Sequence, residues 1–124
     1  MTTALLLIAH GSRQEEANAD LHHVVLEMRR RGRYAVVEAC FLELAQPDIA
    51  SGGQRCVEQS AARVILLPYF LSAGVHVRRD LTAARQLLAE RFPQTEFLLA
   101  EPLGRHPLLL EVIAERAAAA EAQP

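Results

Sequence analysis

Four short aliphatic stretches recur along the chain, each followed by a segment with the residue spacing of a helix. The first stretch, about Ala4 to Ala9, is apolar at every position rather than at alternate positions. Continuous apolar runs are typical of parallel strands covered on both faces, whereas strands with one solvated face alternate apolar and polar residues. The sequence therefore predicts an α/β fold in which a parallel sheet lies between two layers of helices.

The same alternation predicts eight elements within a single domain covering residues 1–124. We expect strands at about Ala4–Ala9, Tyr34–Leu42, Arg63–Phe70 and Glu96–Ala100, and helices at about Glu15–Arg31, Pro47–Ala61, Arg78–Phe92 and Pro107–Ala120. The second helix is the least regular, because Gly52 and Gly53 would each cost about 1 kcal/mol relative to Ala. Four strand–helix units joined by right-handed crossovers most simply give a four-stranded parallel sheet with strand order 2-1-3-4.

Composition argues against several classes of partner. The net charge is -2, and the chain has four Phe, two Tyr and no Trp, so neither a basic stripe nor a base-stacking surface is expected. The run over 4–9 lacks a basic leader and is too short to span a membrane. Cys40 and Cys56 do not form a CxxC motif, and two reduced thiols are typical of a cytosolic protein. We expect a cytoplasmic protein that binds neither nucleic acid nor membrane.

Two histidines occupy matching places in this pattern. His10 directly follows the first aliphatic run, and His76 follows the third run after a short break. With strand order 2-1-3-4, the first and third strands flank the topological switch point, where open α/β sheets bind ligands at their carboxyl edge. Glu43, just past the second strand, lies on the other side of His10. Two imidazoles and a carboxylate suit a divalent first-row metal ion and leave coordination positions open.

These residue types also have common structural roles. A single histidine after a strand is often a loop residue bonded to backbone, and a carboxylate such as Glu43 often caps a helix. His22 and His23 fall within the first helix, where helical geometry predicts structural roles. His106 precedes Pro107 at a helix start, so it is expected to cap that helix, with contact to a ligand at the rim of the site as the alternative.

Arginines at the same edge point to an anionic ligand. Four of them follow the carboxyl ends of strands: Arg13, Arg78, Arg79 and Arg105. The planar guanidinium binds carboxylates through two parallel hydrogen bonds. The small and apolar stretch from Phe70 to Val75 would form a flat wall beside them.

Several motifs, taken together, resemble one family. The stretches Ala9–Arg13, Phe41–Glu43, Pro68–Leu81 and Glu101–Pro107 are similar, in this order and spacing, to the sirohydrochlorin chelatases. The resemblance is to the short, single-domain form of the cobaltochelatase of cobalamin synthesis. The ferrochelatase of siroheme synthesis and a nickel-inserting relative are close kin. The resemblance implies a chelatase-like three-layer sandwich with helices on both faces of the sheet, and a homodimer.

The resemblance also implies roles for individual residues. His10 matches a metal ligand and proton acceptor, His76 matches the second metal ligand, and Glu43 matches an acidic catalytic residue at the metal or substrate site. The tetrapyrrole would be contacted by Arg13, Glu43, Leu71, Ser72, Ala73, Gly74, Val75, His76 and Arg78. No role follows for Gln46, Arg79, Arg105 or His106.

The implied activity is insertion of a divalent metal, cobalt in the first instance, into sirohydrochlorin in cobalamin or siroheme biosynthesis. The metal is a substrate, and no prosthetic group is expected. Insertion expels two pyrrole protons, and imidazole, with an ordinary pKa of about 6.5, can bind a metal or accept a proton near neutral pH. The chain has no P-loop motif, which fits an ATP-independent reaction.

Three alternatives stay open. The same substrate could receive iron or nickel, or the site could hold metal and tetrapyrrole without turnover. A histidine phosphatase would need an arginine directly ahead of its nucleophilic histidine, where this chain has Ala9.

Overall fold

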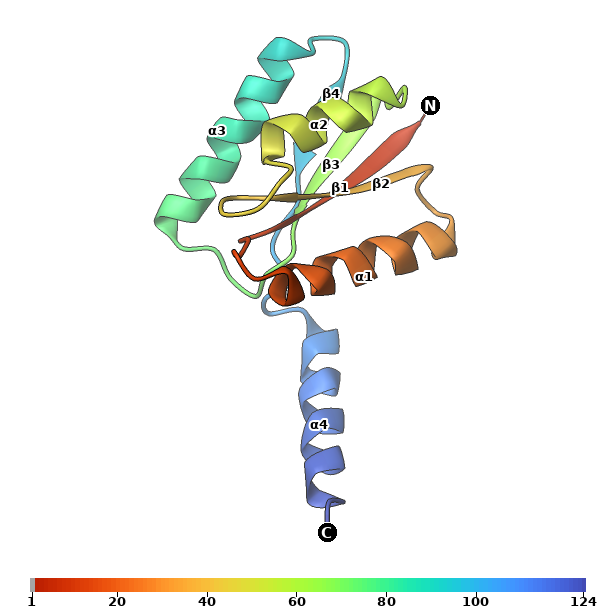
Figure 1. Ribbon diagram of the computed structural model, residues 1–124, viewed down its shortest axis with the longest axis vertical. Coiled ribbons are helices and arrows are strands. Elements are labelled where there is room, and N and C mark those ends of the chain that lie inside the picture. Colours follow the sequence, from red (N-terminus) through yellow and green to blue (C-terminus); the bar gives the residue numbers. More distant parts are fainter. Residues whose placement is uncertain (1) are drawn as a thin grey trace.

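Strands and helices alternate along the whole chain. The computed structural model describes residues 2–124, and Figure 1 shows their arrangement. The elements are β1 (Thr3–Ala9), α1 (Glu15–Arg31), β2 (Val36–Phe41), α2 (Ile49–Glu58), β3 (Arg63–Pro68), α3 (Val75–Arg91), β4 (Glu96–Leu99) and α4 (Pro107–Glu121). All eight predicted elements are present; α1 has the predicted bounds, and the ends of the other elements lie within a few residues of the predictions.

The four strands form one parallel sheet of order β2-β1-β3-β4, which confirms the predicted topology. β1 lies at the centre, where Leu6 is in register with Glu38 of β2 and Leu66 of β3. The carboxyl ends of β1, β2 and β3 therefore meet at one edge of the sheet. Ligands bind at this edge in open α/β sheets.

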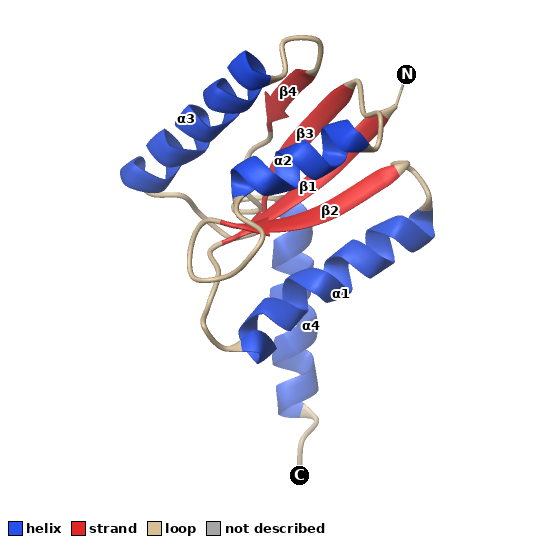
Figure 2. Ribbon diagram, turned by 45° about the horizontal axis from the view of Figure 1, so that its top comes forward, coloured by secondary structure: helices blue, strands red, loops and turns tan. Residues whose placement is uncertain are grey.

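Helices cover both faces of the sheet (Figure 2). Leu6 and Ile8 of β1 are fully buried in a core that includes residues of α2 and α3. Leu5 and Leu7 point to the other face and pack in a second core with Leu21 of α1. Both faces of β1 are thus removed from water, which explains why this strand is apolar at every position.

Two glycines allow α2 to pack closely against its neighbours. A Cβ atom on Gly52 would lie 2.8 Å from the Cβ of Cys40, and one on Gly53 would lie 2.6 Å from a methyl group of Leu88 in α3. The unfavourable helix propensity of glycine is offset here by close approach of the helix to the sheet and to α3. This packing explains why α2 forms despite its sequence.

α3 begins earlier than predicted. The sequence predicted a start at Arg78, but the helix starts at Val75, with Gly74 as its N-cap in extended conformation. The Arg78 N–H donates to the Gly74 carbonyl at 2.9 Å, which closes the first turn. His76 therefore lies in the first turn of a helix rather than in a loop.

α2 and β3 also end differently from the predictions. α2 begins at Ile49 rather than Pro47, because the Asp48 side chain accepts a hydrogen bond from the Ser51 N–H at 2.8 Å and caps the helix. β3 ends at Pro68 rather than Phe70. Pro68 has no N–H group to continue the ladder.

Replacing Asp48 with alanine is expected to lower the free energy of unfolding by about 1 kcal/mol at pH 7. The hydrogen bonds from Ser51 hold the pKa of Asp48 below its ordinary value. The contribution of the charged carboxylate to the cap is therefore fully present above the ordinary pKa and is lost as the pH falls through the lower native pKa, whereas a neutral acceptor oxygen remains. Urea unfolding of the wild type and of Asp48→Ala, at pH 7 and in strong acid, measures how much the cap adds to the free energy of unfolding at each pH. Asp48→Asn, which keeps the acceptor, should retain most of the stability at both pH values. An equal loss for both variants at pH 7 would contradict the capping role.

α4 differs from the other helices in its surroundings. It extends away from the sheet and the other helices (Figure 1), and none of its residues is buried. Its first turn is capped by His106, whose Nδ1 accepts a hydrogen bond from the Leu108 N–H at 3.1 Å, which confirms the predicted capping role.

Across residues 2–124, the helices lack the combination of length and apolar character that a bilayer span requires.

Candidate functional site

His10 and Glu43 are brought together where β1 and β2 end. Parallel pairing continues past the two strands, because the Leu42 N–H donates to the Ala9 carbonyl at 2.9 Å and the Glu43 N–H donates to the His10 carbonyl at 3.1 Å. Both side chains are exposed. The backbones of His10 and Glu43 are thus direct neighbours, as the sheet order predicts.

Gly11 makes this close approach possible. Its φ is +95°, and a Cβ atom there would lie only 1.8 Å from the Glu43 carbonyl oxygen. Only glycine combines a favourable left-handed conformation with the absence of an atom at that position. The two loops that carry His10 and Glu43 are therefore fixed against each other by their backbones.

The imidazole of His10 stacks on an aromatic ring from the end of β3. The ring centroids of His10 and Phe70 are 4.4 Å apart, with an interplanar angle of 30°. Phe70 is in turn held by the segment before α4, since its carbonyl accepts a hydrogen bond from the Leu103 N–H at 3.0 Å. The stack orients an exposed imidazole at the switch point of the sheet. The sequence predicted Phe70 only as part of an apolar wall.

His76 lies in the first turn of α3, and its side chain is exposed. The neighbouring apolar side chains are open to solvent, with Leu71 64% and Val75 71% exposed. Between residues 2 and 124, no group of three or more His, Cys, Asp or Glu side chains is arranged to hold a metal ion. The structure thus places His10, Glu43 and His76 at one edge of the sheet without joining all three in one cluster.

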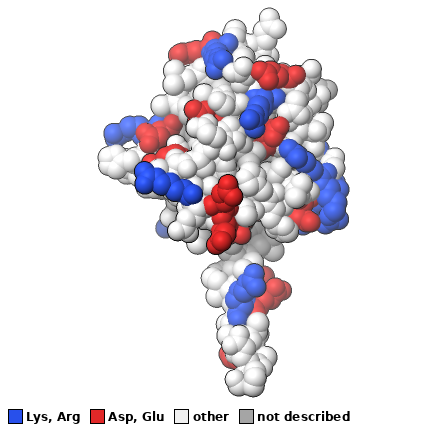
Figure 3. All heavy atoms as spheres, in the orientation of Figure 1, with Lys and Arg blue, Asp and Glu red and all other residues white. Residues whose placement is uncertain are grey.

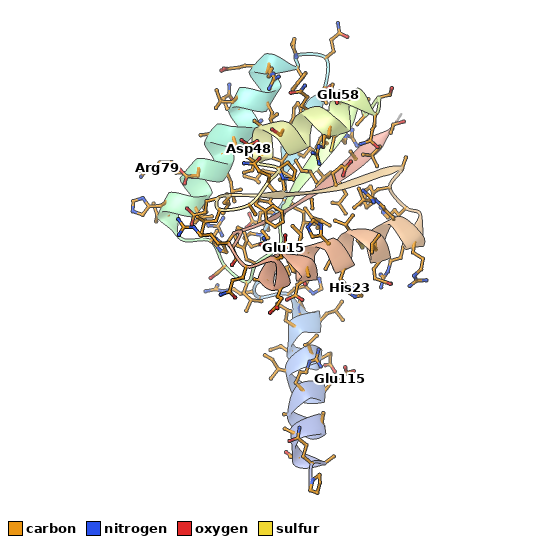
Figure 4. The ribbon with its side chains drawn as sticks, viewed as in Figure 1. Glu15, His23, Asp48, Glu58, Arg79 and Glu115 are labelled. Atoms are coloured by element: carbon orange, nitrogen blue, oxygen red, sulfur yellow. The ribbon has the colours of Figure 1, made fainter. Side chains whose placement is uncertain are left out.

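Arg78 braces the segment before α3. Its Nε donates to the Ala73 carbonyl at 3.2 Å, and its Nη1 lies 3.5 Å from a carboxylate oxygen of Glu101. The exposed Arg79 follows on α3 (Figure 4), and Arg105 has a left-handed backbone with φ of +63°. Arg78 thus has a positioning role that the sequence did not predict.

A depression of about 550 Å³ lies beside the first turn of α1. Its lining includes Arg13, which the sequence predicts to bind substrate, and three polar side chains for which the sequence predicts no binding role: Asn18, His22 and Gln46. Asn18 exchanges two hydrogen bonds with the backbone of Ser12, at 3.0 and 2.8 Å, and so holds the loop after β1. The i, i+4 spacing of Asn18 and His22, on one face of a helix that starts at the carboxyl edge, was the available signal.

His22 also contributes an aromatic contact. Its ring meets that of Phe41 edge to face, with centroids 5.9 Å apart. The predicted structural role of His22 fits this contact, and its place in the lining of the depression adds a polar group near Arg13. His23 points away from the sheet (Figure 4).

A second depression, of about 390 Å³, is acidic. It is lined by Leu42, Glu43, Asp48, Ile49, Ala50 and Asp80. Basic and acidic side chains are interspersed on the face seen in Figure 3, in keeping with the small net charge. The carboxyl edge therefore offers both acidic groups for a cation and guanidinium groups for an anion.

The cysteines are not available as metal ligands. Cys40 and Cys56 are unbonded and fully buried, Cys40 within β2 and Cys56 within α2. Burial raises the pKa of both thiols, that of Cys56 to about 12, so neither forms a thiolate near neutral pH.

Comparisons with known proteins agree with this fold. A model of the CbiX family matches residues 4–120. The chain is 36% identical over 112 residues to the chloroplastic sirohydrochlorin ferrochelatase of Arabidopsis thaliana, covering 90% of this chain and 50% of that protein. It is 28% identical to a sirohydrochlorin cobaltochelatase of Sulfolobus acidocaldarius, covering 91% of this chain and 88% of that protein.

A solved structure shows the same fold. The sirohydrochlorin chelatase SirB of Bacillus subtilis subspecies spizizenii, in complex with cobalt, superposes with a TM-score of 0.88 at 26% identity. The match covers 96% of this chain and 51% of SirB. The chain therefore spans about half the length of SirB and of the Arabidopsis relative. Because the family model matches nearly the whole chain, the chain belongs to the CbiX family.

Proposed function

We propose that this chain inserts a divalent metal ion into sirohydrochlorin without ATP. The observation that carries the proposal is the exposed imidazole of His10, stacked on Phe70 at the switch point of a CbiX-family sheet. Relatives named as ferrochelatase and cobaltochelatase of this tetrapyrrole support the substrate. The chain would then serve as one chelatase unit over its full length.

The proposed metal ligands are His10 and His76, with Glu43 as the acidic group beside them. Two neutral imidazoles bind a first-row divalent ion and leave coordination positions for the incoming tetrapyrrole nitrogens. Glu43 and Asp80 line the same depression, which adds negative charge that favours a cation.

The proposed reaction exchanges two protons for one ion. Each pyrrole N–H gives up its proton as a metal–nitrogen bond forms, and the imidazoles release the metal. His10, freed of the metal, is the proposed acceptor of one proton, directly or through a water that it orients, and the second proton passes to solvent water. Stacking on Phe70 would keep the ring in place during this exchange.

The proposed substrate contacts flank this centre. Sirohydrochlorin carries many carboxylates, which the guanidinium groups of Arg13 and Arg78 can bind. The exposed stretch Leu71–Val75 offers a surface of little polarity for the face of the macrocycle. Arg78 holds this stretch through the Ala73 carbonyl, so it would position the wall as well as neutralise charge.

Cobalt is the proposed metal, because the short-form resemblance and the Sulfolobus relative point to cobaltochelatase. Iron is the alternative that the Arabidopsis relative favours. We propose a cytoplasmic location, since the two unbonded thiols suit a reducing compartment. We propose a homodimer as well, because two copies of the chain would supply the length of the longer relatives.

The test is an anaerobic absorbance assay with purified protein, sirohydrochlorin and Co²⁺, Fe²⁺ or Ni²⁺ in turn. We expect insertion well above the uncatalysed rate without ATP, fastest with cobalt. Faster insertion of iron would reassign the metal. Tight binding of sirohydrochlorin with no acceleration by any metal would contradict the chelatase and favour a carrier.

A further inference from the structure

α4 carries an apolar surface that its own chain leaves exposed. Apart from four charged residues, its sequence is apolar, and large side chains stand in water on several sides of it. The exposed fractions are 67% for Leu108, 67% for Leu110, 46% for Val112 and 64% for Ile113. A helix that is apolar around much of its circumference is normally buried. The part of α4 that faces the viewer in Figure 3 is mostly uncharged.

The sheet has a matching uncovered area. On the face that α1 covers only over β1 and β2, Ile65 of β3 is in register with Leu98 of β4. Ile65 and Leu67 are half-buried, and Leu98 is 42% exposed. On the opposite face, under α2 and α3, the alternate residues are closed off: Val64 and Leu66 are 0% exposed and Phe97 is 4% exposed. Parallel sheets are normally covered on both faces, so one helix is missing over β3 and β4.

The size of the uncovered area fits α4. A helix of 15 residues is about 22 Å long, and a strand of 6 residues is about 20 Å long. Ile65, Leu67 and Leu98 are aliphatic, as are the large exposed side chains of α4, so their contact would bury apolar area. The only charges on this face of β3 and β4 among residues 2–124, Arg63 and Glu96, pair with each other at 3.1 Å at the amino-terminal end of the two strands.

The connection to α4 directs the helix away from its own sheet. The Leu103 N–H donates to the Phe70 carbonyl at 3.0 Å. A Cβ atom on Gly104 would lie 1.9 Å from the Leu71 carbonyl oxygen, so the backbones touch there. These contacts fix the segment before α4 against the end of β3, and α4 leaves the body beyond them (Figure 1).

We propose that two copies of this chain exchange α4, each helix covering the β3–β4 face of the other copy beside that copy's α1. The exchange is isologous, because each copy gives a helix and receives one, so the assembly closes as a dimer. It gives the proposed homodimer a specific form. The connection also contacts Phe70, on which His10 stacks, so the dimer contact would brace the site.

Cysteine cross-linking tests the exchange. Leu98→Cys is placed on the sheet face and Ile113→Cys on α4, in separate full-length chains of different tag length. The two variants are mixed through a cycle of unfolding and refolding and treated with a short bis-maleimide reagent. We expect a covalent heterodimer in the mixture and in neither variant alone. The native thiols are buried with raised pKa, so the wild-type chain should not react.

Leu87→Cys is the matched control for the sheet position. Leu87 is 66% exposed on α3, which covers the opposite face, so its mixture with Ile113→Cys should give no heterodimer. Light scattering should give twice the 13.7 kDa chain mass for the wild type and a single chain mass for Leu98→Asp. Leu87→Asp should leave the dimer intact.

Three results would overturn the proposal. Cross-linking of Ile113→Cys with itself would show that two α4 helices pair with each other. A cross-linked monomer from the Leu98→Cys, Ile113→Cys double variant would show that α4 closes on its own sheet. A wild-type mass of 13.7 kDa would show that no dimer forms. None of these readouts measures metal insertion, so they leave the proposed activity unaffected.

Discussion

Replacing His10 with alanine is expected to lower the rate of metal insertion by at least about 100-fold while leaving the fold intact. The imidazole is both a proposed metal ligand and the proposed proton acceptor, and loss of a positioned general base alone typically costs about 10²–10⁴-fold. Stability should change little, because the side chain is exposed and its main contact is the stack on Phe70. Such a pair contributes about 1 kcal/mol.

The measurement combines the absorbance assay with thermal unfolding. His76→Ala should reduce insertion comparably, because the second proposed ligand is lost. His23→Ala is the matched control, since His23 is an exposed histidine on α1 that points away from the sheet (Figure 4). Wild-type rates in His10→Ala or His76→Ala would remove that residue from the mechanism. A His10→Ala variant that no longer unfolds cooperatively would show that the ring holds the fold rather than the reaction.

The topology follows from patterns that the sequence displays directly. β1 is apolar from Ala4 to Ala9 because both of its faces are buried, and this pattern favours a covered parallel strand over a strand with one solvated face. Once four strand–helix units are counted, the handedness rule leaves few strand orders, and the observed order was the simplest of them. The positions of His10 and Glu43 at one edge then follow from the topology.

Other features depend on contacts that the sequence does not display. The close packing that favours Gly52 and Gly53 in α2 involves Cys40 and Leu88, which belong to other elements. The stack of Phe70 on His10 joins residues sixty positions apart, and no local pattern predicts it. The start of α3 was misplaced because glycine at an N-cap leaves no side-chain signal, and His76 was placed in a loop as a result.

For α4, the sequence predicts where the helix starts but not where it packs. Its start at Pro107 was predicted correctly, because proline in the first turn is a local signal. Its direction was not predicted, because a helix with apolar residues around much of its circumference does not identify the face that packs. The segment that directs it depends on the approach of Gly104 to Leu71, a contact between distant loops.

Gly11→Ala is expected to have the largest effect on the fold among single-methyl changes at the site. The added Cβ would lie 1.8 Å from the Glu43 carbonyl oxygen and 3.2 Å from the Cβ of Phe41, so two backbone segments must separate. Strain of a left-handed residue costs about 1–3 kcal/mol. The loss of the hydrogen bond from Glu43 to His10 adds to it, so we expect a total of about 2–4 kcal/mol.

Gly32→Ala is a control that separates the cost of a positive φ from the cost of the clash with Glu43. Gly32 also has a positive φ, +72°, but a Cβ atom there would meet nothing within 4 Å. The Gly32→Ala variant should lose only the free energy that a non-glycine residue costs in the left-handed conformation, about 1 kcal/mol. Urea unfolding of both variants measures the difference, which isolates the contact with Glu43. Gly11→Ala should also slow metal insertion in the fraction that remains folded, because His10 and Glu43 move apart, whereas Gly32→Ala should not. Equal losses of stability in the two variants, with insertion unchanged in both, would show that the approach of these loops does not hold the site together.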